Sequence, residues 1–333
     1  MKTQTITPSF FEGQVSLEET DSGLCPWRLP IDHYDLFPSP GNTLWEKAGD
    51  AAGIRIRLAT SSSAVGLRIT PAENNRVFDL TMDNQIIQTV TLPDNETDIL
   101  FESLPKNDKT VEIWLPQLAP VIVESILLND GNEAAAVKDC RPHWVTYGSS
   151  ITHCRQAHSP ARTWPATAAR MKNVHLTCLG FGGDCHIEPM IASTIATLRA
   201  DLISLKIGIN VQGGPSLGQR TFMASVIGFI KIIREQHPAI PIAAVSPIIS
   251  PPRETEPNSA GYTLPMMREE IKEAVDRISR SCGDSALKYV NGLELFDRQW
   301  VAEMMPDELH PNGDGYEAMG ERAANIIIDP LLG

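Results

Sequence analysis

The residues of this chain that could do chemistry begin with two adjacent serines near its middle. The sequence Gly-Ser-Ser at 148–150 follows a short apolar run, and Asp307 and His310 lie three residues apart near the C-terminus. A serine hydroxyl is a weak nucleophile until a neighbouring base takes its proton. His310 could be that base, and Asp307 could fix the tautomer of His310 and stabilise its charged form. Together these groups could attack a carboxylic ester.

An attack on an ester also needs hydrogen-bond donors for the oxyanion that forms on the carbonyl. The backbone N–H groups of Ser150 and Gly183 could serve, because a glycine lets the chain approach closely. The side-chain amide of Asn210 could provide a third donor. Each of these residues follows an apolar run, as expected for the end of a buried strand.

The second half of the chain contains the elements that must position these residues, because short apolar runs alternate there with longer helical patterns. Strands are predicted at 143–148, 174–181, 201–210, 240–249 and 287–292, and helices at about 163–172, 188–199, 217–236, 264–282 and 314–327. This alternation predicts βαβ units and a parallel sheet with helices on both faces. Ligands of such sheets bind outside the carboxyl ends of the strands, where the candidate residues lie.

Roughly the first 140 residues have a different character. Short, mostly alternating β-rich segments lie between 53 and 130, separated by turn clusters such as "PAENN" and "PKNDK". Strands of this length and spacing predict an antiparallel β-sandwich with a jelly-roll-like arrangement, and no helix is predicted there. We therefore expect a β-sandwich domain at 1–140 and an α/β domain at 141–333.

The four groups of candidate residues resemble, in this order, the sequence blocks of the SGNH, or GDSL, hydrolase superfamily. The matching positions are Gly148 to Ser150, Gly183, Gly208 to Asn210, and Asp307 with His310. Ser149 and Val211 stand where the family has acidic residues. The resemblance covers about residues 143–333 and implies a flavodoxin-like, three-layer α/β/α fold.

The resemblance also implies an activity. Ser150, rather than Ser149, would be the nucleophile of a serine esterase that hydrolyses a carboxylic ester through an acyl-enzyme. The expected substrate has a short acyl group, such as the O-acetyl group of a sugar or of another small alcohol. His310 and Asp307 would complete the triad, and this chemistry needs no metal or organic cofactor.

Two alternatives to hydrolysis remain open. An acyltransferase could use the same triad to pass the acyl group to an alcohol. The pairing of a β-sandwich with such a domain resembles two-domain members of the superfamily, among them carbohydrate esterases and an antibiotic-pathway acyltransferase. In the second alternative, from another functional class, the chain is a glycan-binding protein with an inactive hydrolase-like domain.

A second serine also matches a catalytic pattern. Ser216 lies in "GPSLG", which satisfies the Gly-x-Ser-x-Gly pattern of a nucleophile elbow. An elbow serine lies directly at the end of a strand, whereas Ser216 follows Asn210 by six residues and comes after a proline. We therefore interpret 211–218 as a loop that leads into the next helix.

Several side chains near the predicted site are candidates to line a substrate pocket. They are His153, Asp184, His186, Trp27, Arg28 and Pro247. The histidine, aspartate and cysteine side chains beside Ser150 and Gly183, Cys154 among them, are of types that can ligate a metal. Their spacing matches no recognised metal site. The segment "CPWRLP" at 25–30 has a second interpretation, as a rigid segment that packs the two domains together. The proline-rich stretch at 246–257 could shape specificity.

Composition argues against several kinds of partner. The chain has 41 acidic and 28 basic residues, a net charge of -13, which disfavours nucleic acid and anionic membranes and favours a small-molecule or glycan ester. We see no signal peptide and no apolar run of about 18 residues, so a cytoplasmic protein is expected. The six cysteines form no CxxC pair and are expected to be free thiols. The sequence leaves the oligomeric state open.

Overall fold

A parallel sheet forms the centre of the C-terminal half in the computed structural model, which describes residues 1–332. Its strands are β13 (His143–Gly148), β14 (His175–Gly180), β15 (Leu202–Lys206), β16 (Ile242–Val245) and β17 (Leu287–Val290). They lie in the order β14-β13-β15-β16-β17, and each neighbouring pair is parallel. This is the flavodoxin-like order. The second strand, β14, lies on one side of β13, and the later strands are added on its other side. Ligands of such folds bind at that point, between the carboxyl ends of β13 and β15.

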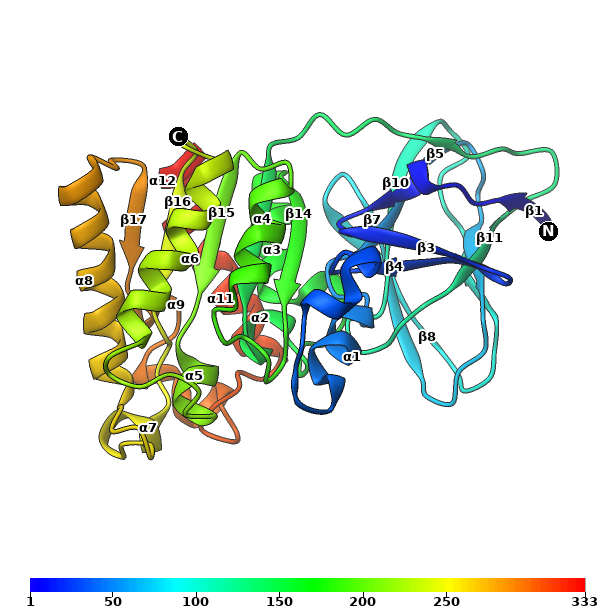
Figure 1. The fold of residues 1–333 in the computed structure, drawn as a ribbon. Coiled ribbons are helices and arrows are strands. Elements are labelled where there is room, and N and C mark those ends of the chain that lie inside the picture. The colour runs from blue at the N-terminus through cyan, green and yellow to red at the C-terminus, as the bar shows by residue number, and fades with distance from the viewer. Residues whose placement is uncertain (333) are drawn as a thin grey trace.

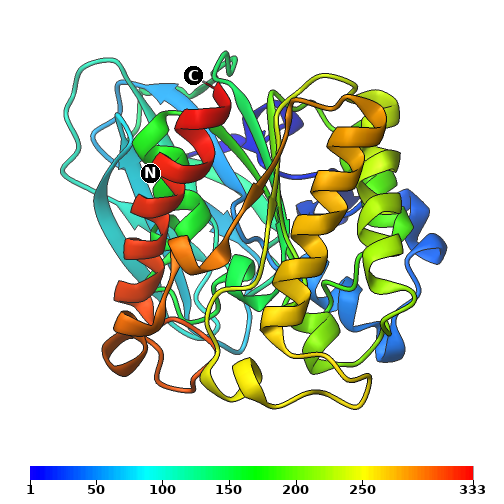
Figure 2. The ribbon, with the colours of Figure 1, turned by 90° about the vertical axis from the view of Figure 1, so that its left-hand side faces the viewer.

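Helices cover both faces of this sheet, which gives the predicted three-layer fold (Figure 2). The long helices α4 (Pro189–Thr197), α6 (Phe222–Gln236) and α8 (Leu264–Cys282) pack on one face. The other face is covered by α3 (Trp164–Lys172) and α11 (Gly313–Ala323). The short helices of this half are α2 (Ser150–His153), α5 (Ile209–Gly213), α7 (Pro251–Thr255), α9 (Gly292–Leu295), α10 (Val301–Met304) and α12 (Asp329–Leu332).

Local sequence signals explain where two of these helices begin and end. Thr163 caps α3, because its side chain accepts the N–H of Ala166, and Pro165 occupies the first turn. Helix α8 ends at Cys282, and the next residue, Gly283, adopts the left-handed conformation that glycine tolerates at this position. The sequence therefore predicts the boundaries of these helices to within a residue.

Two antiparallel sheets form the N-terminal half, beside the parallel sheet (Figure 1). One contains β1 (Lys2–Thr5), β3 (Ser16–Thr20), β4 (Gly23–Trp27), β6 (Val65–Ile69), β9 (Asp98–Phe101) and β11 (Val123–Leu128). The other contains β2 (Phe11–Glu12), β5 (Arg55–Thr60), β7 (Arg76–Met82), β8 (Gln85–Leu92), β10 (Lys109–Trp114) and β12 (Ala135–Ala136). Alternating apolar side chains from both sheets share one core, so the predicted β-sandwich is confirmed.

Two predictions about helices were wrong. Helix α1 (Thr43–Gly49) lies in the half where no helix was predicted. It is too short to show helical periodicity, and Leu44, Trp45 and Ala48 stabilise it by packing into the core of the C-terminal half. Helix α6 begins at Phe222 rather than 217, because Pro215 and Gly218 favour the turn that precedes it.

Two sequence-level expectations concern the molecule as a whole. All six cysteines are free, as predicted, and only Cys140 and Cys282 are exposed. Among residues 1–332, no helix combines the length and the apolar character needed to cross a bilayer.

Candidate active site

The two adjacent serines differ sharply in their surroundings. Strand β13 ends at Gly148 and α2 begins two residues later, so the turn between them is very tight. Ser149 is fully buried and caps α2, since its Oγ accepts the N–H of Ile151 at 3.3 Å. Ser150 is only half-buried and occupies the first helical position. Its hydroxyl, unlike that of Ser149, is therefore available for chemistry.

Ser150, His310 and Asp307 form one hydrogen-bonded series. The Oγ of Ser150 lies 2.8 Å from Nε2 of His310, and Nδ1 of His310 lies 2.7 Å from Oδ2 of Asp307. A carboxylate can only accept, so Nδ1 of His310 carries the proton and Nε2 is free to accept one from Ser150. The folded chain thus brings together three residues that the sequence separates by up to 160 positions.

The turn that holds Asp307 and His310 is stabilised from within and from a neighbouring loop. Oδ1 of Asp307 accepts the backbone N–H groups of Leu309 at 3.0 Å and His310 at 2.7 Å. Burial would raise the pKa of Asp307, but these N–H groups and the His310 ring together hold that pKa below its usual value. Asp307 is therefore a carboxylate over the whole range in which a histidine can act as a base.

The loop after β16 supplies a contact that the sequence did not predict. Glu308 adopts a left-handed conformation, with φ of 57°, between the two catalytic candidates. Its backbone C=O accepts the hydroxyl of the buried Ser250 at 2.7 Å. Glu254 accepts the N–H of Ser250 and pairs with Arg268 at 2.7 Å. The proline-rich segment at 246–257 thus contacts the turn that holds Asp307 and His310 directly.

Two of the predicted oxyanion donors, Gly183 and Asn210, lie on segments that are hydrogen-bonded to each other. The glycine loop (181–185) follows β14, and an added Cβ on its Gly182 would be 3.7 Å from Cα and Cβ of Ser150. Gly183 has φ of 89°, which favours glycine. Asn210, in the first turn of α5, accepts the N–H of Cys185 through its Oδ1 at 3.1 Å. This bond leaves the Nδ2 end of the Asn210 amide free to donate.

The predicted pocket residues after β14 lie around the glycine loop. Asp184 accepts the hydroxyl of Thr43, from the N-terminal half, at 2.7 Å. His186 contacts the Gly183 carbonyl at 3.0 Å through Nε2 and Ser216 Oγ at 2.7 Å through Nδ1. Ser216 therefore bonds to His186 rather than to His310. His186 and Ser216 also line a cavity of about 370 Å³, together with Leu217, Phe229 and other residues.

Three other predicted pocket residues lie behind the glycine loop or further into the contact between the two halves. His153 is fully buried, its Nε2 2.6 Å from the carbonyl of Gln117, and burial together with nearby Arg28 lowers its pKa well below the usual value. Trp27 donates to Glu18 at 2.9 Å, and Arg28 is fully buried with its guanidinium on backbone carbonyls. These three residues lie where the two halves meet, which favours the packing interpretation of 25–30.

Pro247, a predicted pocket residue, and the thiol of Cys154 are both buried. Pro247 is buried against Gly208, whose added Cβ would lie 2.9 Å from the proline ring. Cys154 is fully buried, and burial raises the pKa of its thiol well above the usual value. A thiol in that state is a poor nucleophile.

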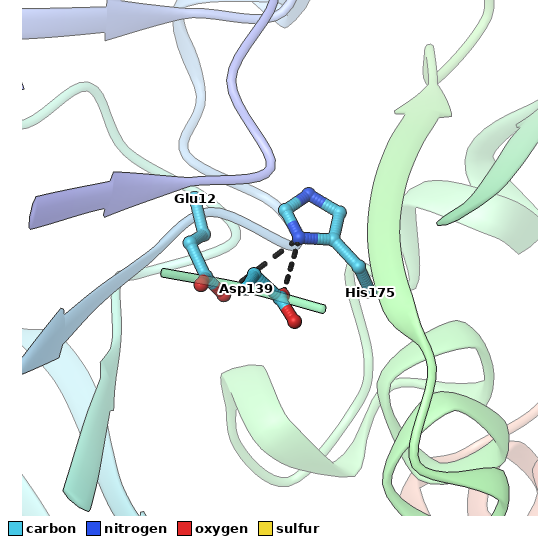
Figure 3. Close-up of side chains that lie close together, drawn as sticks. All are labelled: Glu12, Asp139 and His175. Atoms are coloured by element: carbon cyan, nitrogen blue, oxygen red, sulfur yellow. Dashed lines mark hydrogen bonds and ion pairs between the residues drawn. The ribbon is translucent and has the colours of Figure 1, made fainter. Parts of the chain in front are cut away.

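A second group of metal-ligating side chains lies between the two halves, away from Ser150. Glu12, Asp139 and His175 each offer a ligand atom within 4.8 Å of the others (Figure 3). The same carboxylates, with Glu112, pair with three guanidinium groups, those of Arg55, Arg57 and Arg141. Three carboxylates and three guanidinium groups balance in charge, so this cluster has little attraction left for a divalent cation. We interpret it as an ion-pair network.

Comparisons with known proteins cover both halves. The model of the GDSL-like Lipase/Acylhydrolase family matches residues 146–318, and that of the SsfX3 N-terminal domain matches residues 9–124. A search of curated proteins finds no match.

Solved structures resemble the whole chain. The salicylyl-acyltransferase SsfX3 from a tetracycline biosynthetic pathway is 31% identical, with a TM-score of 0.88 over 97% of this chain and 96% of that one. A putative GDSL-like lipase from Bacteroides ovatus is 18% identical, with a TM-score of 0.77 and 95% of each chain covered. A family two carbohydrate esterase from Clostridium thermocellum, in complex with cellohexaose, is 15% identical, with a TM-score of 0.64 over 94% of this chain and 96% of that one.

Proposed function

Because the chain belongs to the GDSL-like lipase/acylhydrolase family, we propose that it is a serine esterase acting on a carboxylic ester with a short acyl group. One observation carries this proposal: Ser150, His310 and Asp307 form an unbroken hydrogen-bonded series at the carboxyl end of β13. The alcohol part of the substrate is proposed to be a sugar or another small alcohol, from the pairing of a β-sandwich with such a domain.

The proposed reaction has two halves. Oγ of Ser150 attacks the ester carbonyl while Nε2 of His310 takes the hydroxyl proton, which forms a tetrahedral oxyanion. His310 then gives the proton to the leaving alcohol, and the acyl group stays on Ser150. His310 then takes a proton from a water molecule, which attacks the acyl-enzyme. The acid leaves as His310 returns the proton to Ser150. Asp307, charged throughout, stabilises the imidazolium that forms in each half.

The donors proposed for the oxyanion are two backbone N–H groups and one side-chain amide. The N–H of Ser150 belongs to the first helical residue and so lies outside the intrahelical hydrogen-bond ladder. Gly183 would provide the second N–H and Asn210 Nδ2 the third donor. The bond from Cys185 N–H to Asn210 Oδ1 supports this role, because it fixes which end of the amide can donate.

Transfer of the acyl group to an alcohol is the second candidate function. The 31% identity to a salicylyl-acyltransferase over 97% of the chain favours it. The first half of the reaction would be the same, and an acceptor alcohol would replace water in the second half. The two functions therefore differ in how well the site excludes water, and not in the triad.

The proposed domain boundary lies near residue 140, so that residues 1–140 form one domain and residues 141–333 the other. This position falls between the two family matches, which end at 124 and begin at 146. If the C-terminal half were inactive, the chain would be a glycan-binding protein, and the experiment below distinguishes that alternative.

The test uses a fluorophosphonate probe and a short-chain aryl ester on the wild type, on Ser150→Ala and on the control Ser216→Ala. We expect labelling and ester cleavage in the wild type and in Ser216→Ala, and only background in Ser150→Ala. Added alcohols would then separate hydrolysis from transfer by the ratio of free acid to new ester. A folded wild type without labelling would contradict the proposal and favour the glycan-binding alternative.

A further inference from the structure

Arg28 is a charged residue that the proposed mechanism does not use, although it is fully buried beside the site. Its Nε donates to the carbonyl of Asp50 at 2.7 Å, and its Nη2 donates to that of Lys47. Both acceptors belong to the N-terminal half. Its Nη1 crosses to β14 and donates to the carbonyl of Gly180 at 2.5 Å. Burying a guanidinium is costly, and here its hydrogen bonds all go to backbone carbonyls.

Gly180 is the residue from which the glycine loop begins. It is the last residue of β14, and an added Cβ there would overlap the backbone of α2 at Thr152 and His153. The next residue, Phe181, donates its N–H to the carbonyl of Gly148 at 2.8 Å. The Arg28 guanidinium lies over the Phe181 ring, 5.1 Å from its centroid. Arg28 thus contacts the peptide before the loop and the first side chain in it.

The N-terminal half holds the other end of the same loop as well. Thr43, the first residue of α1, donates its hydroxyl to Oδ1 of Asp184 at 2.7 Å. Gly182 and Gly183 lie between these two contacts and have no side chains of their own to fix them. Without outside contacts, two adjacent glycines have a large conformational freedom.

We propose that Arg28 is a positioning residue for the oxyanion donor of Gly183, assisted by Thr43. This inference rests on the proposed function. An oxyanion hole accelerates the reaction only if its donors are already in place, within roughly 0.5 Å, before charge develops. The N-terminal half therefore takes part in catalysis through the glycine loop and without touching the substrate.

Arg55 offers a control, because it donates to a carbonyl at the other end of β14, although it also pairs with Glu12 and Glu112. It is 1% exposed, it donates to the carbonyl of Leu176 at 2.9 Å, and its guanidinium lies 5.1 Å from the centroid of the Trp114 ring. Leu176 precedes Gly180 by four residues, or roughly 13 Å along a strand. Loss of Arg55 should thus affect stability without affecting the glycine loop.

The first experiment compares Arg28→Met with Arg55→Met. We expect both to lower Tm, but only Arg28→Met to lower kcat, by about 10- to 100-fold with KM little changed. Equal kcat in folded Arg28→Met and wild type would overturn the proposal. A wild type that Ser150-directed probes do not label would contradict the proposed function instead, so the two failures are distinguishable.

A second pair of variants removes any dependence on the folding of Arg28→Met. Thr43→Val deletes the hydroxyl at a half-buried position, and Thr43→Ser keeps it. We expect a several-fold fall in kcat in Thr43→Val and recovery in Thr43→Ser. Hydrogen exchange of the amides at 181–185 should quicken in Thr43→Val and not in Arg55→Met. Unchanged exchange and unchanged kcat in Thr43→Val would overturn the proposal without reference to the substrate.

Discussion

At the scale of single residues, surroundings decide which of several similar side chains can react. Ser149 and Ser150 are neighbours in sequence, yet one caps a helix and the other contacts His310. Ser216 also bonds to a histidine, His186, but that histidine bonds to a backbone carbonyl instead of a carboxylate. A carboxylate hydrogen-bonded to the imidazole stabilises its charged form. Of these three serines, only Ser150 contacts a histidine that is paired with a carboxylate.

The two serines should respond differently to the loss of the hydroxyl. Ser149→Ala removes the cap of α2 and should lower the free energy of unfolding by about 0.5–2 kcal/mol. The folded variant should still react with a fluorophosphonate probe at Ser150, which mass spectrometry of labelled peptides would identify. Loss of labelling in a Ser149→Ala preparation with native Tm would assign Ser149 a role in the chemistry.

Asn210 provides a test of the oxyanion site. Removing one such donor typically lowers kcat by about 100- to 1000-fold, because the ground-state carbonyl is held less tightly than the oxyanion. We expect Asn210→Ala to fold, to label at Ser150 and to show this loss, and Asn210→Asp to be slower still, since a carboxylate repels the oxyanion. If Tm fell while kcat stayed normal, Asn210 would only stabilise the turn at α5.

The pH dependence should show a single ionisation on its acid side. The pKa of Asp307 is held below its usual value, so Asp307 remains a carboxylate as the pH falls, and one other group sets the acid side of the profile. A protonated His310 cannot accept the Ser150 proton, and activity is lost. We expect log kcat/KM to fall with a slope of one below the transition, and a slope of two would show that Asp307 titrates with it.

At the scale of elements, the parallel sheet collects residues from distant segments. β13 and β15 are neighbours, so the turn that carries Ser150 and the helix that carries Asn210 lie at the same edge. The loop after β16 reaches the same edge, where Ser250 contacts the turn that contains His310. The strand order therefore explains why three loops converge there.

Ser250 should be a positioning residue for His310. Ser250→Ala removes the donor to the Glu308 carbonyl and should lower the free energy of unfolding by about 1–3 kcal/mol. Its kcat should fall as well, because His310 follows Glu308 by two residues. Ser246 is a matched control: it is buried in the same segment, but its hydroxyl contacts Tyr289 at 3.0 Å, away from the turn that holds His310. Ser246→Ala should lower Tm alone, and an equal kcat in both variants would contradict this role.

At the scale of the whole molecule, the interface between the two halves combines buried charges with a shared apolar core. Helix α1 packs against the core of the C-terminal half, and Arg28 and Arg55 both donate to carbonyls of β14. The ion-pair network, of which Figure 3 draws Glu12, Asp139 and His175, lies in the same interface. The two halves are thus joined by contacts that neither could satisfy alone.

This network should make stability depend on pH. Burial, with a contribution from Arg55, lowers the pKa of His175 to about 3, although Asp139 acts in the opposite direction. The unfolded chain takes up this proton first, near pH 6.5, so folding free energy is lost as the pH falls from about 6.5 towards 3. The loss for one proton is about 1.4 kcal/mol per pH unit.

Urea unfolding of His175→Gln at pH 7.5, 6.5 and 5.5 would test this effect. We expect the wild type to lose more stability than His175→Gln over this range, while His33→Gln, at an exposed position, should follow the wild type. Glu12, Asp139, Arg55 and His143 also face or lie close to His175, so their charges contribute to the same balance. Parallel pH profiles in the wild type and His175→Gln would contradict the assignment.

The sequence by itself determined the periodic elements and the order of the candidate residues. Helix α8 and strand β13 match their predicted ranges because their apolar spacing and their caps are local properties. The pairing of Asp307 with His310 is local too, since three residues in a turn bring the side chains together.

Only the tertiary structure decided what depends on contacts between distant segments. Helix α1 forms because another part of the chain buries its apolar face, and Ser250 meets Glu308 because β16 ends at the same edge as β13. Arg28 could equally have faced a ligand or a carbonyl as far as its neighbours in sequence indicate. A hydrogen bond to Gly180, 152 positions away, depends on how two sheets pack, and no local pattern encodes that distance.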